Sequence, residues 1–104
     1  MTQKLTIVLS QMTQVVGDLP ANTAAMRDVR ARHPDADLIL YPELQLIGYP
    51  PEDLVLKPAL AKRAAKLLAE LAADTADGGP AMLVGSVERE GDALYNIVAL
   101  LDGG

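Results

Sequence analysis

The chain has 104 residues, half of them apolar, and a formal net charge of −5, a composition that fits one small globular domain. Basic residues do not cluster with aromatic residues, so the sequence argues against binding to nucleic acid. Cysteine is absent and histidine occurs once, which excludes disulfides and thiolate nucleophiles in these residues and argues against a metal site.

Hydropathy gives no sign of a membrane protein. No apolar run reaches the roughly 20 residues that a membrane-spanning helix needs. The first nine residues contain one lysine and a short apolar stretch, without the long apolar region of a secretory signal. We therefore expect a cytoplasmic protein that does not enter a membrane.

The chain begins with a predicted strand and a predicted helix. Lys4–Ser10 is expected to be a strand buried on both faces, because its centre is continuously apolar. Asp18 can cap the next helix, which we expect over Ala21–Arg32. The spacing of Met26 and Val29 places them on the inner face of that helix.

A second predicted strand leads to an acidic residue. Ala36–Tyr41 is expected to be a buried strand that stops at Pro42, because proline cannot donate to a sheet ladder. Glu43 should therefore lie just past the end of this strand. A loop is expected over Gln45–Lys57, with one helical turn around Glu52–Leu56.

The second half of the chain predicts a helix and a hairpin. The helix is expected from Pro58 to the stop at Gly78-Gly79-Pro80. Its apolar residues at helical spacing are Leu60, Ala64, Leu67, Leu68 and Leu71. Ala81–Val87 and Leu94–Leu101 are predicted strands, which the short link Glu88–Asp92 makes an antiparallel hairpin. The order β-α-β-α-β-β indicates an α/β fold.

Its position makes Glu43 a candidate catalytic residue, although the pattern alone favours an ordinary loop carboxylate. Ligands of open α/β sheets gather beyond the carboxyl ends of the strands. The neighbours of Glu43 include Leu40, Tyr41 and Leu44, and partial burial among them would raise its pKa and suit it to general base catalysis. The alternative is a loop carboxylate that faces water, as most glutamates do.

Short motifs along the whole chain resemble the carbon–nitrogen hydrolase (nitrilase) superfamily. They are Ser10-Gln11, Val16-Gly17-Asp18 with Asn22, Tyr41-Pro42-Glu43-Leu44, Gly48-Tyr49-Pro50-Pro51-Glu52-Asp53-Leu54, Gly85 and Tyr95-Asn96. The Gly-Tyr-Pro-Pro-Glu-Asp-Leu stretch resembles in particular the branch of glutamine-dependent NAD synthetases.

The resemblance implies a fold and a reaction. The fold is a four-layer α-β-β-α sandwich, and the reaction uses a Glu–Lys–Cys set in which Glu43 matches the general base. In the family this glutamate takes the proton of the cysteine, whose thiolate attacks the glutamine carboxamide. The lysine stabilises the tetrahedral intermediate. Tyr49 is expected to line the glutamine pocket, or alternatively to pack with its hydroxyl satisfied.

The sequence departs from this pattern because it contains neither the lysine nor the cysteine. The family's lysine follows the fourth strand and its cysteine lies further on, whereas Lys57 precedes the second helix and is expected to be solvated. We therefore expect residues 1–104 to be the N-terminal part of a glutaminase domain in a longer protein, and this chain alone to be inactive.

Ligands and partners follow from the same resemblance. Glutamine would bind here, whereas deamido-NAD, ATP and magnesium would bind a separate synthetase domain, where ammonia completes NAD. No cofactor and no metal are expected within these residues, and self-association is expected because family members assemble through sandwich faces. Two alternatives remain: a part of a free-standing amidase or carbamoylase, and a non-catalytic module that binds a partner through an open sheet edge or face.

Overall fold

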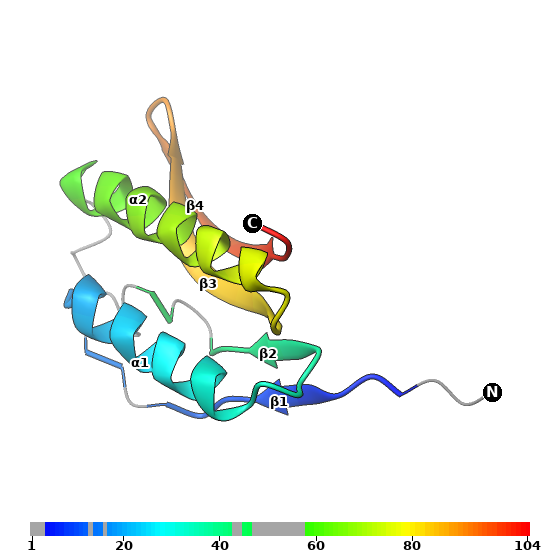
Figure 1. The fold of residues 1–104 in the computed structure, drawn as a ribbon. Helices are drawn as coiled ribbons and strands as arrows, with labels where there is room; N and C mark the ends of the chain where they lie inside the picture. The colour runs from blue at the N-terminus through cyan, green and yellow to red at the C-terminus, as the bar shows by residue number, and fades with distance from the viewer. Residues whose placement is uncertain (1–3, 13, 16, 43–44, 47–57) are drawn as a thin grey trace.

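The computed structural model describes residues 4–12, 14–15, 17–42, 45–46 and 58–104. The elements in chain order are β1 (Ile7–Leu9), α1 (Leu19–Arg32), β2 (Leu38–Leu40), α2 (Pro58–Asp74), the 3-10 helix η2 (Thr75–Asp77), β3 (Ala81–Glu90) and β4 (Ala93–Leu101). The strands form one sheet in the order β1-β2-β3-β4 (Figure 1). β1, β2 and β3 are parallel and β4 is antiparallel to β3, so the predicted α/β order and hairpin are confirmed.

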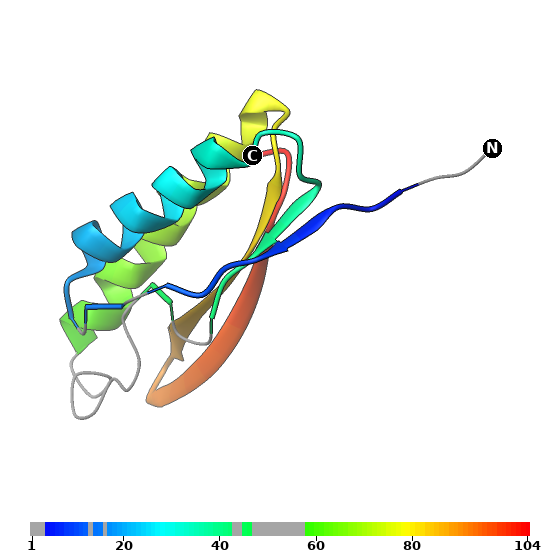
Figure 2. The same ribbon diagram turned by 90° about the horizontal axis from the view of Figure 1, so that it is seen from below.

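Both helices lie on the same face of the sheet, α1 beside α2 (Figure 2). The core fills the layer between them and the strands, where Met26 and Leu71 from the helices and Ile39 and Met82 from the sheet are fully buried. The predicted apolar stripe of α2 is confirmed, because its members are either buried or packed against the core.

α1 begins two residues earlier than its pattern predicts, at Leu19. Asp18 is the cap, as expected: its Oδ1 accepts a hydrogen bond from the backbone N–H of Ala21 at 3.2 Å. The buried stripe of the helix consists of Leu19, Asn22, Thr23 and Met26. Two of these four residues are polar, so α1 turns hydrogen-bonding groups as well as apolar ones toward the interior.

The hairpin turn is tighter than the sequence predicts. β3 continues past Val87 to Glu90, and β4 begins at Ala93. Only Gly91 and Asp92 connect the strands, and Gly91 adopts a φ of +60°, which suits a two-residue hairpin turn and a residue without a Cβ.

The prediction that the first strand is buried on both faces is wrong for this chain. Val8 packs against the core, whereas Ile7 and Leu9 are 46% and 70% exposed. The same alternation occurs on β4, where Val98 and Leu100 are 67% and 64% exposed. The apolar run is there, but burial of its second face needs another layer, and none of the described elements supplies one (Figure 2).

Arg30 joins α1 to the segment between α2 and β3. Its guanidinium donates two hydrogen bonds to the Asp77 carboxylate, at 2.9 and 2.7 Å, and a third to the carbonyl of Pro80 at 2.9 Å. The bonds from Arg30 and from the N–H of Gly79 hold the pKa of Asp77 well below its usual range. The Arg30 side chain is only 11% exposed, so its end of the pair is less screened by solvent than in an average surface ion pair.

We expect Asp77→Asn to lower the urea midpoint of the chain slightly at neutral pH. A carboxyl whose folded pKa is depressed stabilises the fold above its unfolded pKa of about 4, and this contribution is lost as the pH falls toward the folded pKa. The difference between wild type and variant should therefore shrink from about pH 4 downward. A difference that stays constant from neutral to acidic pH would contradict the ion pair.

Two leucine truncations should distinguish the covered face from the bare one. Leu71 is fully buried, so Leu71→Ala should lower the free energy of unfolding of this chain by about 2–5 kcal/mol. Leu100 is 64% exposed, so Leu100→Ala should cost less than about 1 kcal/mol. Urea unfolding measures both values, and equal losses would show that the second face is covered in solution.

Candidate functional site

The carboxyl ends of β1 and β2 lie at the same edge of the sheet. The ladder extends one residue past β1, because the N–H of Ser10 donates to the carbonyl of Leu40, the last residue of β2, at 2.9 Å. β2 ends at Leu40, and Glu43 follows it by three residues in the sequence. The predicted general base Glu43 and the predicted substrate residue Tyr49 themselves lie outside the described residues.

Tyr41 and Leu46, which stand before and after Glu43 in the sequence, both donate backbone hydrogen bonds to β3. The N–H of Tyr41 donates to the carbonyl of Leu83, and the N–H of Leu46 donates to the carbonyl of Gly85, both at 3.2 Å. In an uninterrupted parallel ladder the donor to Gly85 would stand two residues after Tyr41. Here the donor to Gly85 is Leu46, five residues after Tyr41. The regular ladder is therefore interrupted within the interval from Tyr41 to Leu46.

Tyr41, the first residue of this interval, is hydrogen-bonded to α1. The phenol is buried and donates to the carbonyl of Met26 at 2.9 Å. Burial raises the pKa of Tyr41 well above its usual value, and the positive charge of Arg30 offsets this only in part. Tyr41 therefore stays protonated at neutral pH and acts as a structural donor rather than as an acid or base.

Side-chain amides gather around Gln45 and Leu46, at the other end of the interval. Asn22 bonds to Val15 and to Leu46, and the Nε2 of Gln14 donates to the Oε1 of Gln45 at 3.1 Å. Gln45 is fully buried. Its Nε2 and the Oγ of Ser86 are the buried side-chain polar atoms for which the described part of the chain offers no hydrogen-bond partner.

Sequence reasoning identified Asn22 only as part of a motif and did not assign these contacts. One signal was available: Asn22 stands between Leu19 and Met26 at the spacing of the inner face of a helix, so a buried amide could have been inferred. Its partners could not, because Val15 and Leu46 lie on different segments. Gln45 carries no comparable signal, since it was assigned to a loop.

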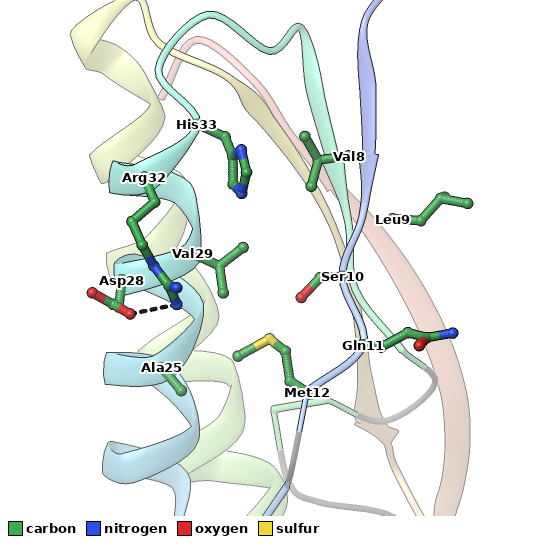
Figure 3. Close-up of a pocket in the computed structure, with 10 residues that line it drawn as sticks. All are labelled: Val8, Leu9, Ser10, Gln11, Met12, Ala25, Asp28, Val29, Arg32 and His33. Carbon is green, nitrogen blue, oxygen red and sulfur yellow. Dashed lines mark hydrogen bonds and ion pairs between the residues drawn. The ribbon is translucent and has the colours of Figure 1, made fainter.

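A hollow of about 410 Å³ lies between β1 and α1. Val8, Met12 and Val29 point into it, whereas Leu9 and Gln11 point away (Figure 3). The charged residues at its rim, Asp28 and Arg32, pair with each other at 2.7 Å and are both largely exposed. Its lining thus offers no buried acid or base, and it does not form a catalytic site by itself.

Metal ligands do not gather anywhere in the described ranges, where no three residues among His, Cys, Asp and Glu are placed to share an ion. No helix in the same ranges is both long and apolar enough to span a membrane.

Comparison with known proteins gives a consistent result. The family description "Carbon-nitrogen hydrolase" matches residues 6–104. A glutamine-dependent NAD(+) synthetase from Rhodobacter capsulatus is 41% identical over 106 aligned residues, covering all of this chain and 19% of the relative. The chain thus spans about a fifth of the length of that curated relative.

Solved structures agree with the sequence comparison. A glutamine-dependent NAD+ synthetase from Acinetobacter baumannii in complex with ADP matches with a TM-score of 0.82 and 36% identity, over 95% of this chain and 19% of that chain. A variant amidase from Nesterenkonia sp. AN1, with the acetamide moiety of fluoroacetamide bound covalently at its active-site cysteine, matches with a TM-score of 0.83 and 25% identity. That match covers 95% of this chain and 38% of the amidase.

Proposed function

Because this chain belongs to the carbon–nitrogen hydrolase family, we propose that it forms part of the glutaminase domain of a glutamine-dependent NAD synthetase. The observation that carries the proposal is the similarity to such a synthetase over the full length of the chain. The interrupted ladder supports it, because Glu43 stands in the sequence between Tyr41 and Leu46, the two donors to β3, and follows a strand whose carboxyl end is the edge where ligands of α/β folds bind.

Glu43 is the general base of the proposed reaction. It takes the proton of a cysteine thiol, and the thiolate attacks the carboxamide carbon of glutamine. The C–N bond breaks, the proton passes to the leaving nitrogen, and ammonia departs from a thioester. Water then releases glutamate and restores the thiol. Tyr49 follows Glu43 closely in the sequence and is proposed to contact the glutamine.

The other two members of the catalytic set must come from outside these 104 residues. The chain has no cysteine, and its only lysine between β2 and α2 is Lys57, which stands before the second helix and out of the family order. We place the catalytic lysine, which stabilises the oxyanion, and the cysteine in residues of the whole protein that lie beyond this chain. The chain covers about a fifth of the Rhodobacter capsulatus synthetase, so most of such a protein lies outside the aligned region and can supply both residues.

The whole protein would also supply the synthetase reaction. The proposal assigns deamido-NAD, ATP and magnesium to its separate synthetase domain, and the ADP complex of the Acinetobacter baumannii synthetase supports a nucleotide site in such proteins. Self-association through the sandwich faces belongs to the same proposal. A cytoplasmic location fits, because glutamine and ATP are available there.

A free-standing amidase is the second candidate, and the similarity to the Nesterenkonia enzyme favours it. The two candidates differ in what the whole protein does with ammonia. A synthetase uses glutamine to form NAD in the presence of ATP, whereas an amidase hydrolyses small amides without ATP. Assaying the full-length protein with both kinds of substrate decides between them.

In the full-length protein, Glu43→Gln should abolish NAD synthesis from glutamine and leave synthesis from added ammonia largely intact. The carboxamide cannot accept the thiol proton, whereas the ammonia-dependent step does not need it. Parallel assays with glutamine and with ammonium chloride measure the two activities. Undiminished glutamine hydrolysis in this variant would reject Glu43 as the base.

The 104-residue chain by itself should release no ammonia from glutamine, because it has no cysteine with which to form a thioester. An enzymatic ammonia assay, with the full-length protein as the positive control, measures this. Turnover by the chain alone would overturn the thiol mechanism.

A further inference from the structure

We propose that Asn22 is a positioning residue for the general base, because its buried side chain fixes the backbone just beyond Glu43 to α1. This inference rests on the function proposed above. Asn22 lies in the first turns of α1 and is only 2% exposed. It is a polar residue in the inner stripe of a helix, and its amide is used entirely for contacts outside that helix.

The carboxamide of Asn22 connects three segments. Its Nδ2 donates to the carbonyl of Val15 at 2.8 Å and to the carbonyl of Leu46 at 3.2 Å. Its Oδ1 accepts from the N–H of Val15 at 2.9 Å. Both amide hydrogens are therefore engaged. Removing them would leave the buried carbonyl of Leu46 without this donor, whereas the carbonyl of Val15 would keep the N–H of Asp18 as a donor. The Asn22 side chain thus links α1 both to the segment after β1, at Val15, and to the segment after Glu43, at Leu46.

Leu46 is held from two directions. Its N–H donates to β3 through Gly85, and its carbonyl accepts from Asn22. At the other end of the interval, Tyr41 donates to β3 through Leu83 and to α1 through Met26. Both ends of the interval that contains Glu43 are therefore attached to the same strand and the same helix.

A general base acts only within hydrogen-bond reach of the proton that it removes, at about 2.6–3.2 Å. A misplacement of about 1 Å can lower a rate by about 100-fold. Since Asn22 fixes one end of the interval, loss of its donors should disturb the geometry of proton removal more than the binding of glutamine. The expected sign is a lower kcat with little change in KM.

Thr23 provides a matched control on the same helix. It is adjacent to Asn22, equally buried at 2% exposure, and polar. Its hydroxyl donates to the carbonyl of Leu19 at 2.8 Å, a bond that stays within α1. Loss of the hydroxyl in Thr23→Val therefore removes a buried hydrogen bond without releasing another segment.

The test uses the full-length protein with glutamine as substrate. Asn22→Asp keeps the shape and the acceptor but removes both donors, so kcat for glutamine hydrolysis should fall at least about tenfold while KM stays within about threefold. NAD synthesis from added ammonia should be unchanged. Thr23→Val should leave kcat for glutamine within about twofold of wild type, since about 100-fold losses need a displaced catalytic group.

A carboxylate at position 22 faces two carbonyl oxygens and could prevent folding, so Asn22→Ala is the second variant, which removes the donors without adding charge. The proposal is overturned if a folded Asn22 variant retains the wild-type kcat, if Thr23→Val lowers kcat equally, or if neither Asn22 variant folds. Glu43→Gln separates the two hypotheses. If it still hydrolyses glutamine, Glu43 is not the base and its proposed catalytic role fails, whereas an inactive Glu43→Gln beside a fully active Asn22→Asp rejects only the positioning role.

Discussion

The interruption of the hydrogen-bond ladder after β2 constrains the rest of the site. Backbone groups that move out of a sheet ladder inside a protein must find other partners, because an unpaired buried polar group costs free energy. Here the ladder between β2 and β3 is interrupted, and α1 supplies a partner for the backbone carbonyl of Leu46 through the carboxamide of Asn22. The carbonyl of Met26, also on α1, accepts from the side-chain hydroxyl of Tyr41. The helix next to β1 thereby becomes part of the support for a segment that follows β2.

The sheet imposes a second constraint, because it is apolar on both faces and the helices cover only one. The alternation along β1 and β4 leaves Ile7, Leu9, Val98 and Leu100 largely exposed. A contiguous apolar face of this kind marks a surface that another element covers. In a four-layer sandwich the cover is a second sheet, packed about 10 Å away. The bare face is thus what one half of a carbon–nitrogen hydrolase fold would present.

Much of the fold could be predicted from local patterns. Asp18 and the spacing of Met26 and Val29 predicted α1, the apolar stripe predicted α2, and the short link Glu88–Asp92 predicted the hairpin. The boundaries were less accurate, since β3 runs on to Glu90 and α1 starts at Leu19. The prediction that Lys4–Ser10 is buried on both faces was wrong for one face. An apolar run shows that a strand can be buried, but it does not show whether a second layer is present.

The sequence by itself determined the order of the elements, the family, and Glu43 as the candidate base, since these depend on local periodicity and on short motifs. Only the tertiary structure decided which sheet face is covered and which side chains support the interval around that glutamate. Asn22 and Leu46 are 24 residues apart, and Gln14 and Gln45 are 31 apart. Their contacts exist because α1 packs against the sheet, and no local pattern records which distant backbone group a buried amide will meet.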